Sequence, residues 1–327
     1  MLSPVIANIT EGLVNGEKAL LSYEEACRIA RPEPDDVMDI LFAAHKVTQH
    51  FKKNKVFTCA ITNAKSGACP EDCAFCAQSA HHNTGIKPHP LLGKDLMAAQ
   101  AEAMWRAGAP RYSLVTSGLR LGNSELDRIA DTVKAIRKRT GLEVCTSLGT
   151  LTPGMAGKLK RSGVSMYHHN LETAESYFHH ICTTHSYAED IETVKTAKSA
   201  GLQVCSGGIL GLGETWEQRV ELALALRQLD VDRIPINFLN PIPGTKLAHR
   251  KPLSPWEALR SIALFRLTNP DKDITVCGGR EITLKDYQSW VFFAGANGLM
   301  IGNYLTTQGR NIEADMEMIR DMGRCHE

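Results

Sequence analysis

Short apolar runs alternate along most of this chain with longer segments in which apolar residues recur every three or four positions. The short runs, rich in Val, Ile and Thr, predict strands, and the longer periodicity predicts amphipathic helices. The predicted strands are Val56–Ile61, Tyr112–Thr116, Glu143–Leu148, Val164–Asn170, Gln203–Gly207, Ile234–Leu239, Ile274–Cys277 and Leu299–Tyr304. The predicted helices that follow them are Ala98–Arg106, Ser124–Thr140, Pro153–Ser162, Tyr187–Ala200, Thr215–Leu229, Pro255–Leu267, Leu284–Ala294 and Asn311–Met322.

Eight strand-then-helix repeats predict an α/β fold of the TIM type, a (β/α)8 barrel of parallel strands surrounded by helices. A doubly wound open sheet has the same alternation and is the competing layout. Before the first strand, a short helix is predicted from the capping residue Ser22 to about Ile29. A second helix is predicted after it, with apolar residues at helical spacing: Met38, Ile40, Leu41, Ala44 and Val47. We expect an N-terminal helical extension over residues 1–50 and a barrel with a C-terminal helix over residues 51–327. The tail, Arg324–Glu327, is expected to fray.

Composition indicates the setting of the protein more than its chemistry. The 327 residues are 43% apolar, enough for a sizeable core, and the net charge of +1 without charged blocks indicates neither nucleic acid nor an anionic membrane as a partner. The N-terminus does not resemble a secretory signal, and no run approaches the ~18 apolar residues of a membrane span. Ten cysteines in such a chain favour metal or redox chemistry in a reducing cytoplasm over disulfides.

Three of the cysteines, Cys69, Cys73 and Cys76, lie in one loop after the first predicted strand, at the spacing C-x3-C-x2-C. Active-site residues of (β/α)8 barrels lie at the C-terminal ends of strands, which is where this loop falls. Three thiolates are one fewer than a closed zinc site or a fully cysteine-ligated iron–sulfur cluster uses, so a fourth position is left open. A structural zinc loop or a patch of reactive thiols is the simpler alternative.

This loop resembles the cluster-binding loop of the radical S-adenosylmethionine (radical SAM) enzymes, including the aromatic Phe75 before its last cysteine. Residues 207–214, GGILGLGE, are similar to the GxIxGxxE motif of the same superfamily. The resemblance implies a [4Fe–4S] cluster whose fourth iron binds S-adenosylmethionine (SAM), and cleavage of SAM to a 5′-deoxyadenosyl radical. The cluster ligands that it implies are Cys69, Cys73 and Cys76.

Within that superfamily the chain resembles the biotin synthases over nearly its whole length. The segments that carry the resemblance include residues 65–73 (KSGACPEDC), 204–208 (VCSGG), 235–237 (PIN), 279–281 (GRE) and 294–297 (AGAN). Biotin synthases insert sulfur between two carbons of dethiobiotin and take it from a second, auxiliary iron–sulfur cluster deep in the barrel. The resemblance thus implies dethiobiotin as substrate, a reductant such as flavodoxin or ferredoxin, and a homodimer.

The expected ligands of the auxiliary cluster depart from the commonest form of the family, which uses three cysteines and an arginine. Cys145, Cys205 and Arg280 match three of those positions, whereas Ser113 occupies the fourth. Alternate strands of a barrel contribute one layer of side chains, so cysteines on strands one, three, five and seven can face one level. The four cysteines on these strands are Cys59, Cys145, Cys205 and Cys277. The chain resembles the variant with a four-cysteine cluster, of [2Fe–2S] or four-iron type, with Arg280 as an alternative ligand or a neighbour.

The resemblance assigns further residues to the SAM and substrate sites. The residues expected around SAM are Phe75, Thr116, Ser117, Asn170, Glu172, His185 and Ile209, and those expected at dethiobiotin are His168, Asn170 and Asn237. His168 and His185 depart from the asparagine and arginine that are usual there, and a loop-capping amide is the alternative for Asn237. His168 and His169 are neighbours on a strand, so only one is expected to reach the pocket. Three thiols are left without a role: Cys27, Cys182 and Cys325.

Three functions remain open from the sequence. The first is that of a biotin synthase, and the second is that of another radical SAM enzyme of the same subfamily, such as an amino-acid mutase or a maturase of a hydrogenase cofactor. The third is a zinc-stabilised or electron-carrying protein that is not an enzyme. The third accounts for the C-x3-C-x2-C loop but for neither the GxIxGxxE motif nor the four cysteines on alternate strands.

Overall fold

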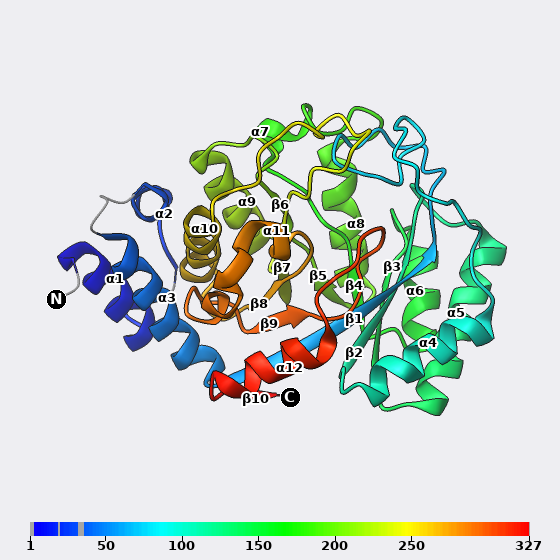
Figure 1. Cartoon of the computed structure of the whole chain (residues 1–327), viewed down its shortest axis with the longest axis horizontal. Helices are drawn as coiled ribbons and strands as arrows, with labels where there is room; N and C mark the ends of the chain where they lie inside the picture. Colours follow the sequence, from blue (N-terminus) through cyan, green and yellow to red (C-terminus); the bar gives the residue numbers. More distant parts are fainter. Residues whose placement is uncertain (1–2, 19, 32–35, 327) are drawn as a thin grey trace.

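The computed structural model describes residues 3–18, 20–31 and 36–326 of the chain. Its parallel sheet has the order β1-β2-β3-β4-β5-β7-β8-β9, and β9 pairs again with β1 (Figure 1). The strands are β1 (Lys55–Lys65), β2 (Arg111–Thr116), β3 (Glu143–Ser147), β4 (Met166–His168), β5 (Gln203–Cys205), β6 (Gly208–Leu210), β7 (Arg233–Phe238), β8 (Asp273–Val276) and β9 (Gly298–Met300). The expected (β/α)8 barrel is confirmed, and the doubly wound alternative is wrong because the sheet closes.

The fifth strand of the barrel is interrupted, with β5 and β6 separated by Ser206 and Gly207. Both pieces pair with β7, Cys205 opposite Arg233 and Gly208 opposite Ile236. A Cβ on Gly207 would lie 2.0 Å from the carbonyl oxygen of Pro235, so only glycine allows this close approach of the two strands. The interruption lies between Cys205 and the glycine-rich segment that follows it.

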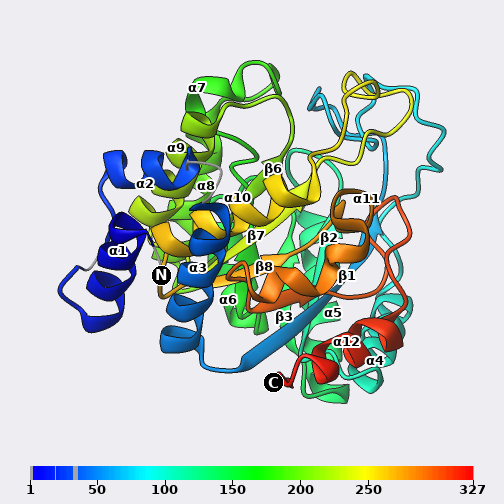
Figure 2. The same cartoon turned by 60° about the vertical axis from the view of Figure 1, so that its left-hand side comes forward.

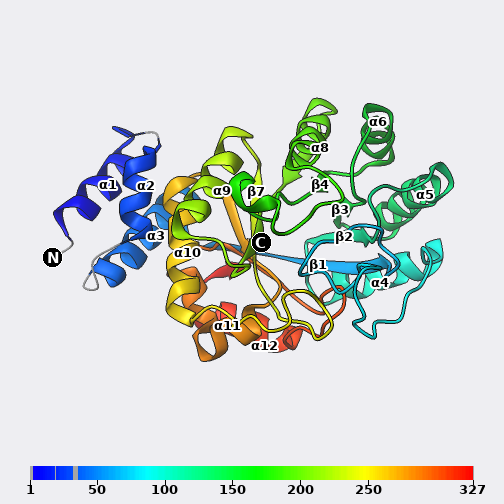
Figure 3. The same cartoon turned by 90° about the horizontal axis from the view of Figure 1, so that it is seen from above.

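Helices surround the strands on the outside of the barrel (Figure 3). They are α4 (Lys94–Arg106), α5 (Asn123–Arg139), α6 (Pro153–Ser162), α7 (Glu175–Phe178), α8 (Tyr187–Ser199), α9 (Trp216–Gln228), α10 (Pro255–Thr268), α11 (Arg280–Leu284) and α12 (Ile312–Asp321), with a 3-10 helix, η2 (Lys285–Phe292). Local sequence signals define several of their ends. Thr152 caps α6 ahead of a proline at its first position, and Ser254 does the same for α10.

The N-terminal helices pack on the outside of this barrel, next to α9 and α10 (Figure 2). They are α1 (Pro4–Asn15), α2 (Tyr23–Ala30) and α3 (Val37–Lys52). Their buried residues, such as Ile9, Ile40 and Val47, belong to the same hydrophobic core as Ile262 of α10. A domain boundary at residue 50 stays a prediction. In the described part of the chain, no helix has the length and apolar character that crossing a membrane requires.

Two details of the expected fold were wrong near the chain ends. The helix α1 was missed, so the extension contains three helices rather than two. The tail does not fray up to residue 326, because Cys325 and His326 form β10, a short parallel strand beside Lys55 and Val56 of β1. The His326 ring also lies 2.8 Å from the Thr58 hydroxyl. Pairing with a distant strand stabilises this segment, which local sequence could not predict.

The single helix expected over Leu284–Ala294 was also wrong. The chain forms the short α11 and then the 3-10 helix η2, and Lys285 at the junction has a φ of 50°. A lysine with positive φ cannot continue an α-helix, so the segment breaks there. Arg280, the first residue of the short α11, faces the C-terminal helix α12.

A buried ion pair connects α11 to α12. Arg280 Nη2 donates to Asp315 Oδ2, and both side chains are almost fully buried, with 1% and 0% of their surface exposed. Arg310 Nη1 lies 3.1 Å from the other Asp315 oxygen, and Gln288 accepts from Arg280 Nη1 at 2.6 Å. The C-terminal helix is therefore held by charge as well as by apolar packing.

We predict that Asp315→Ala lowers the free energy of unfolding by about 3–5 kcal/mol, because the Arg280 cation would be left buried and unpaired. Urea unfolding of the iron-free chain measures this. The double variant Arg280→Met/Asp315→Leu is the control and should recover part of the loss. A cost below about 1 kcal/mol for Asp315→Ala, the range of exposed pairs, would contradict the prediction.

Candidate active site

A cavity of about 440 Å³ runs through the barrel from the C-terminal ends of its strands to the first residues of β2 and β7, Arg111 and Arg233. This volume lies in the range of small-molecule sites. The predicted site residues that line it are Cys59, Cys69, Cys73, Phe75, Cys76, Thr116, Ser117, Cys145, His168, Asn170, Glu172, His185, Cys205, Ile209, Asn237 and Cys277. Arg280 does not line it. The fold therefore brings residues from every part of the barrel to one cavity.

The rim cysteines, Cys69, Cys73 and Cys76, lie in a loop that is held by hydrogen bonds on both sides. Cys69 N donates to Gln78 O at 3.1 Å, and Ala80 N donates to Cys69 O at 2.8 Å. The Asp72 carboxylate between them accepts from the amide and the hydroxyl of Thr183. Burial opposes ionisation of Asp72, but these hydrogen bonds outweigh it and hold its pKa well below the usual range. Hydrogen bonds within the protein thus hold the shape of the loop.

The interior cysteines, Cys59, Cys145, Cys205 and Cys277, lie on the alternate strands β1, β3 and β5 and directly after β8. Cys277 continues the β8 ladder, because its amide donates to Ile236 O at 2.9 Å. Burial raises the pKa of all four thiols, that of Cys59 to about 11, and neighbouring thiols of the set raise it further for Cys59, Cys205 and Cys277. Four protonated thiols buried together without a shared ligand would be an unusual core.

The spacing of both cysteine sets argues against a single zinc ion. Two sulfurs bound to one zinc at about 2.3 Å each can be at most about 4.6 Å apart. Among the described residues, the group that brings three metal-binding atoms within 4.8 Å of one another is Glu71, Cys182 and His185. Within either cysteine set, therefore, no three sulfurs lie mutually within that distance. Such spacing fits iron–sulfur clusters, in which each thiolate binds a different iron.

The segment beside the rim cysteines carries a polar network around His185. His185 Nδ1 lies 2.6 Å from Glu71 Oε2 and 3.2 Å from Cys182 Sγ, and its Nε2 lies 3.5 Å from Asp190 Oδ2. Burial lowers the pKa of His185, but the interactions with Asp190, Cys182 and Glu71 outweigh it and raise the pKa to about 11. His185 is therefore an imidazolium at neutral pH. Nδ1 is thus engaged within the protein, whereas Nε2 makes no hydrogen bond to Asp190 and remains able to donate to a further acceptor.

Cys182, to which sequence analysis assigned no role, lies beside the rim cysteine Cys73. Its sulfur lies 3.8 Å from Cys73 Sγ, and its side chain also contacts Thr184 and His185. The contact joins two segments that are more than a hundred residues apart in the sequence, so no local pattern indicated it.

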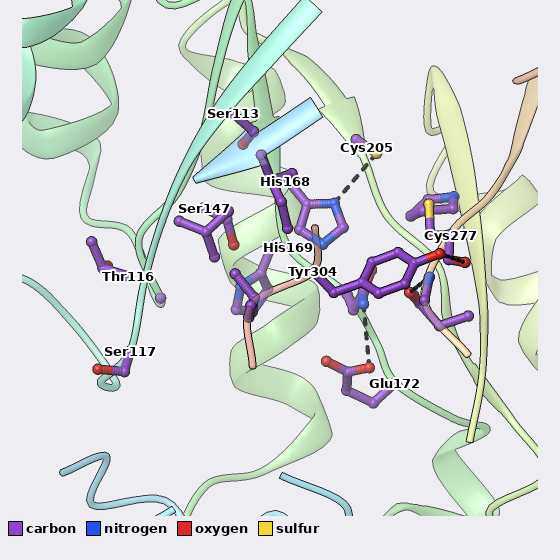
Figure 4. A pocket seen from close by; sticks show the side chains of 18 of the residues that line it. Ser113, Thr116, Ser117, Ser147, His168, His169, Glu172, Cys205, Cys277 and Tyr304 are labelled. Atoms are coloured by element: carbon purple, nitrogen blue, oxygen red, sulfur yellow. Dashed lines mark hydrogen bonds between the residues drawn. The ribbon is translucent and has the colours of Figure 1, made fainter. Parts of the chain in front are cut away.

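His168, the last residue of β4, and His169 after it both line the cavity, which corrects the expectation that only one would (Figure 4). His168 Nδ1 lies 3.3 Å from Cys205 Sγ, whereas His169 Nε2 lies 2.8 Å from Asp190 Oδ1. The alternation of faces applies within a strand, but β4 ends at His168, and His169 already belongs to the loop. Burial, followed by the charges of His169 and Arg233, lowers the pKa of His168 to about 4, so this ring is neutral.

Asn170 and Glu172 form the next pair along this segment. Asn170 Nδ2 donates to Glu172 Oε2 at 3.3 Å, and Asn170 Oδ1 accepts from Gly207 N at 3.2 Å. Glu172 has a φ of 62°, and its main chain accepts from Ile209 N at 2.8 Å. Burial, with the nearby Asp190, raises the pKa of Glu172 to about 8. The pair is thus placed by the interrupted fifth strand.

The remaining predicted residues line the upper walls of the cavity. Phe75 and Ile209 pack against one small apolar cluster with Leu212 and Leu239. Asn237 donates to Gly208 O at 3.3 Å and accepts from Gly278 N at 3.0 Å, so it also has the capping contacts that were the alternative for it. Thr116 ends β2 and Ser117 follows it, and the Ser117 hydroxyl donates to Gly67 O at 2.8 Å.

Arg280 lies near Cys277 but is directed to Asp315 rather than into the cavity. A different arginine, Arg233, lines the cavity instead, together with Tyr304, Asp190 and Thr275. Sequence reasoning missed these four residues. Arg233 directly precedes the predicted strand Ile234–Leu239, where a charged residue is ordinary, so no local signal marked it.

Several buried polar atoms along the cavity have no hydrogen-bond partner within the described chain. They are Ser113 Oγ, Thr116 Oγ1, Thr275 Oγ1 and Arg233 Nε. Buried polar groups are normally paired, so this concentration indicates a cavity that holds ligands in the working protein. The residues present therefore fit bound clusters and a bound cofactor.

Two family models match the chain. Residues 64–226 match the radical SAM superfamily, and residues 235–324 match the biotin and thiamin synthesis associated domain. Among solved structures, methylornithine synthase PylB (18% identity, TM-score 0.84) covers 98% of this chain and 97% of its own. The [FeFe]-hydrogenase maturase HydG (16% identity, TM-score 0.85) covers 100% and 76%. At these identities the two structures show a shared fold alone.

Closer relatives are biotin synthases. That of Syntrophus aciditrophicus is 53% identical over 98% of this chain and 98% of its own length. Those of Nitratidesulfovibrio vulgaris strain Miyazaki F and Geobacter metallireducens are 56% and 53% identical, covering 93% and 95% of this chain and 86% and 94% of theirs. The chain therefore belongs to the biotin synthase family of the radical SAM superfamily.

Proposed function

We propose that this chain forms biotin by inserting sulfur into dethiobiotin in the cavity described above. The observation that carries the proposal is that one cavity holds two separate sets of cysteines. The rim set leaves a ligand position open, and the interior set is complete. An electron carrier or zinc protein needs no open position beside a substrate-sized cavity. A radical SAM enzyme of another kind accounts for the rim set but not for the interior one.

As a member of this family, the chain uses a [4Fe–4S] cluster, SAM and an auxiliary iron–sulfur cluster. The rim cysteines, Cys69, Cys73 and Cys76, would hold the first cluster, with SAM at its open position. The interior cysteines would hold the auxiliary cluster, of [2Fe–2S] or four-iron type. When bound, these groups supply the 5′-deoxyadenosyl radical that removes hydrogen from dethiobiotin and the sulfur that replaces it.

The side chains around the open position match the parts of SAM. Phe75 and Ile209 offer apolar surface to the adenine. Thr116 and Ser117, at the C-terminal end of β2, offer polar groups to the methionyl amine. The imidazolium of His185 takes the place of the usual arginine, because Glu71 and Asp190 keep it charged opposite the SAM carboxylate. Glu172 and Asn170 would hold the ribose hydroxyls.

Dethiobiotin would lie between the two cysteine sets, against His168, Asn170 and Asn237. The neutral His168 ring lies next to Cys205, at the boundary between the upper cavity and the interior cysteines. Each asparagine amide uses one donor and one acceptor in the protein, which leaves a second N–H and a second lone pair for the ureido ring. The substrate would thus be held where radical and sulfur donor can both reach it.

Three further parts of the proposal concern the setting. A small reducing protein such as flavodoxin or ferredoxin would supply electrons, and the protein would work in the reducing cytoplasm. A homodimer would cover part of the exposed apolar surface of the N-terminal helices, which includes Val5, Met38 and Phe42.

We predict that Cys145→Ala/Cys277→Ala loses the iron of one cluster and forms no biotin, but still cleaves SAM to 5′-deoxyadenosine. Replacing the three rim cysteines by alanine should abolish 5′-deoxyadenosine while the interior iron remains. Iron and sulfide analysis after anaerobic reconstitution, with chromatography of both products, measures this. Biotin formation by Cys145→Ala/Cys277→Ala, or zinc in place of iron, would argue against the proposal.

We predict that His185→Ala raises the KM for SAM by about 10- to 100-fold, the loss of one charge-assisted hydrogen bond of about 1.5–3 kcal/mol. His185→Arg should restore most of the affinity, because it returns a permanent cation. His180→Ala, an exposed histidine of the same segment, is the matched control. An unchanged KM in His185→Ala would show that His185 does not contact SAM.

A further inference from the structure

Arg233 lies in the deepest part of the cavity, at the first position of β7. Its side chain is 5% exposed, and its guanidinium stacks over the Phe57 ring at 4.2 Å from the ring centroid. In the sheet it pairs directly with Cys205 of β5. An arginine is rarely buried in a barrel interior, so its position requires a compensating group.

The protein itself compensates this cation only in part. The Asp273 carboxylate lies 3.7 Å from Arg233 Nη2, beyond hydrogen-bond distance. Asp273 is moreover already engaged by Lys52 at 3.1 Å and by the Asn297 amide at 2.8 Å. Arg233 Nε is buried and has no hydrogen-bond partner among the described residues. One N–H of a permanent cation is therefore free to donate within the cavity.

The interior cysteines line the same cavity as this free donor. Cys205 lies directly opposite Arg233 where β5 pairs with β7. On the other side of β7, the amide of Cys277 donates to Ile236 O at 2.9 Å. The arginine therefore lies on the strand between two of the four cysteines and in one cavity with all of them.

The other two arginines in question are already paired. Arg111 also lines the cavity and stacks on Phe57, but its Nε donates to Glu143 at 2.7 Å. Arg280 donates to Asp315 and Gln288. Arg280 Nε also has no hydrogen-bond partner among the described residues, but Arg280 does not line the cavity. Of the three, Arg233 is the one that combines an unsatisfied donor with a place in the cavity.

Four thiolates give an iron–sulfur cluster a net negative charge, which is costly to bury without a nearby cation. Arginine suits this place because its guanidinium is always charged and its planar face can stack on an aromatic ring while its N–H groups point to an anion. Hydrogen bonds to cluster sulfurs and nearby charge also set the reduction potential. A cation at this point would therefore affect both retention of the cluster and its redox behaviour.

We infer that Arg233 binds the auxiliary cluster as its counter-ion, donating a hydrogen bond from Nε to a sulfur at the four-cysteine site. This inference rests on the proposed placement of that cluster at Cys59, Cys145, Cys205 and Cys277. The four-cysteine site would then have an arginine in contact with its cluster, on β7, rather than one among its iron ligands.

The test uses the full chain with Cys69, Cys73 and Cys76 replaced by alanine, so that the auxiliary cluster is the one observed. In this background we compare Arg233→Gln, Arg233→Lys and the control Arg111→Gln, by iron and sulfide per chain and by anaerobic redox titration. Thermal unfolding of the iron-free chains monitors folding.

Arg233→Gln should hold less iron, and its remaining cluster should be harder to reduce, since the reduced cluster carries more negative charge. We expect at least about a tenfold change in the reduction equilibrium, equivalent to about 59 mV for one electron. Arg233→Lys keeps the charge but loses Nε, so it should retain iron with a smaller shift. Arg111→Gln also removes a charge from the cavity, but Arg111 Nε is bonded to Glu143, so this variant should keep its iron and shift the potential clearly less than Arg233→Gln.

Full iron content and an unchanged potential in Arg233→Gln would overturn the inference, and so would equal shifts in Arg233→Gln and Arg111→Gln. If Arg233→Gln does not fold, Arg233→Lys decides, and an unchanged potential there overturns the hydrogen bond. A parent that binds no iron would instead refute the proposed placement of the cluster. The two failures are therefore distinguishable.

Discussion

Closure of the parallel sheet between β1 and β9 is the constraint on which the rest of the structure depends. It directs alternate strands towards one interior, so four cysteines that are distant in the sequence meet in one cavity. It also gives β1 two tasks, because Cys59 faces the interior while the same strand continues to the loop of Cys69. One βα unit thus serves both cysteine sets, and the distance between rim and interior is set by the strand itself.

Fixed charges then distinguish the two ends of the cavity. At the rim, Glu71 and Asp190 keep His185 cationic, where we propose that the carboxylate of SAM binds. In the interior, Arg233 lies among buried thiols. Between them, the neutral His168 and the amides of Asn170 and Asn237 provide hydrogen bonds without net charge. This order suits an anionic cofactor group, a neutral ureido substrate and an anionic cluster.

Much of this arrangement could be predicted from the sequence, because strand periodicity and cysteine placement are local properties. The eight strands of the barrel lie close to their predicted positions, and both cysteine sets line one cavity, although their roles as ligands stay a prediction. What failed depends on distant contacts. Arg280 turns to Asp315 because α12 packs there, Cys182 meets Cys73 across more than a hundred residues, and the tail pairs with β1. Arg233 was missed because its role depends on what lies opposite it in three dimensions.

The central claim is that the interior cysteines hold the cluster that donates sulfur. The most direct measurement is mass spectrometry of biotin formed in a single turnover by protein reconstituted with ³⁴S-sulfide, with no other sulfide present. The account predicts that the biotin carries ³⁴S and that Cys145→Ala/Cys277→Ala yields none. Unlabelled biotin, or labelled biotin from that variant, would contradict it.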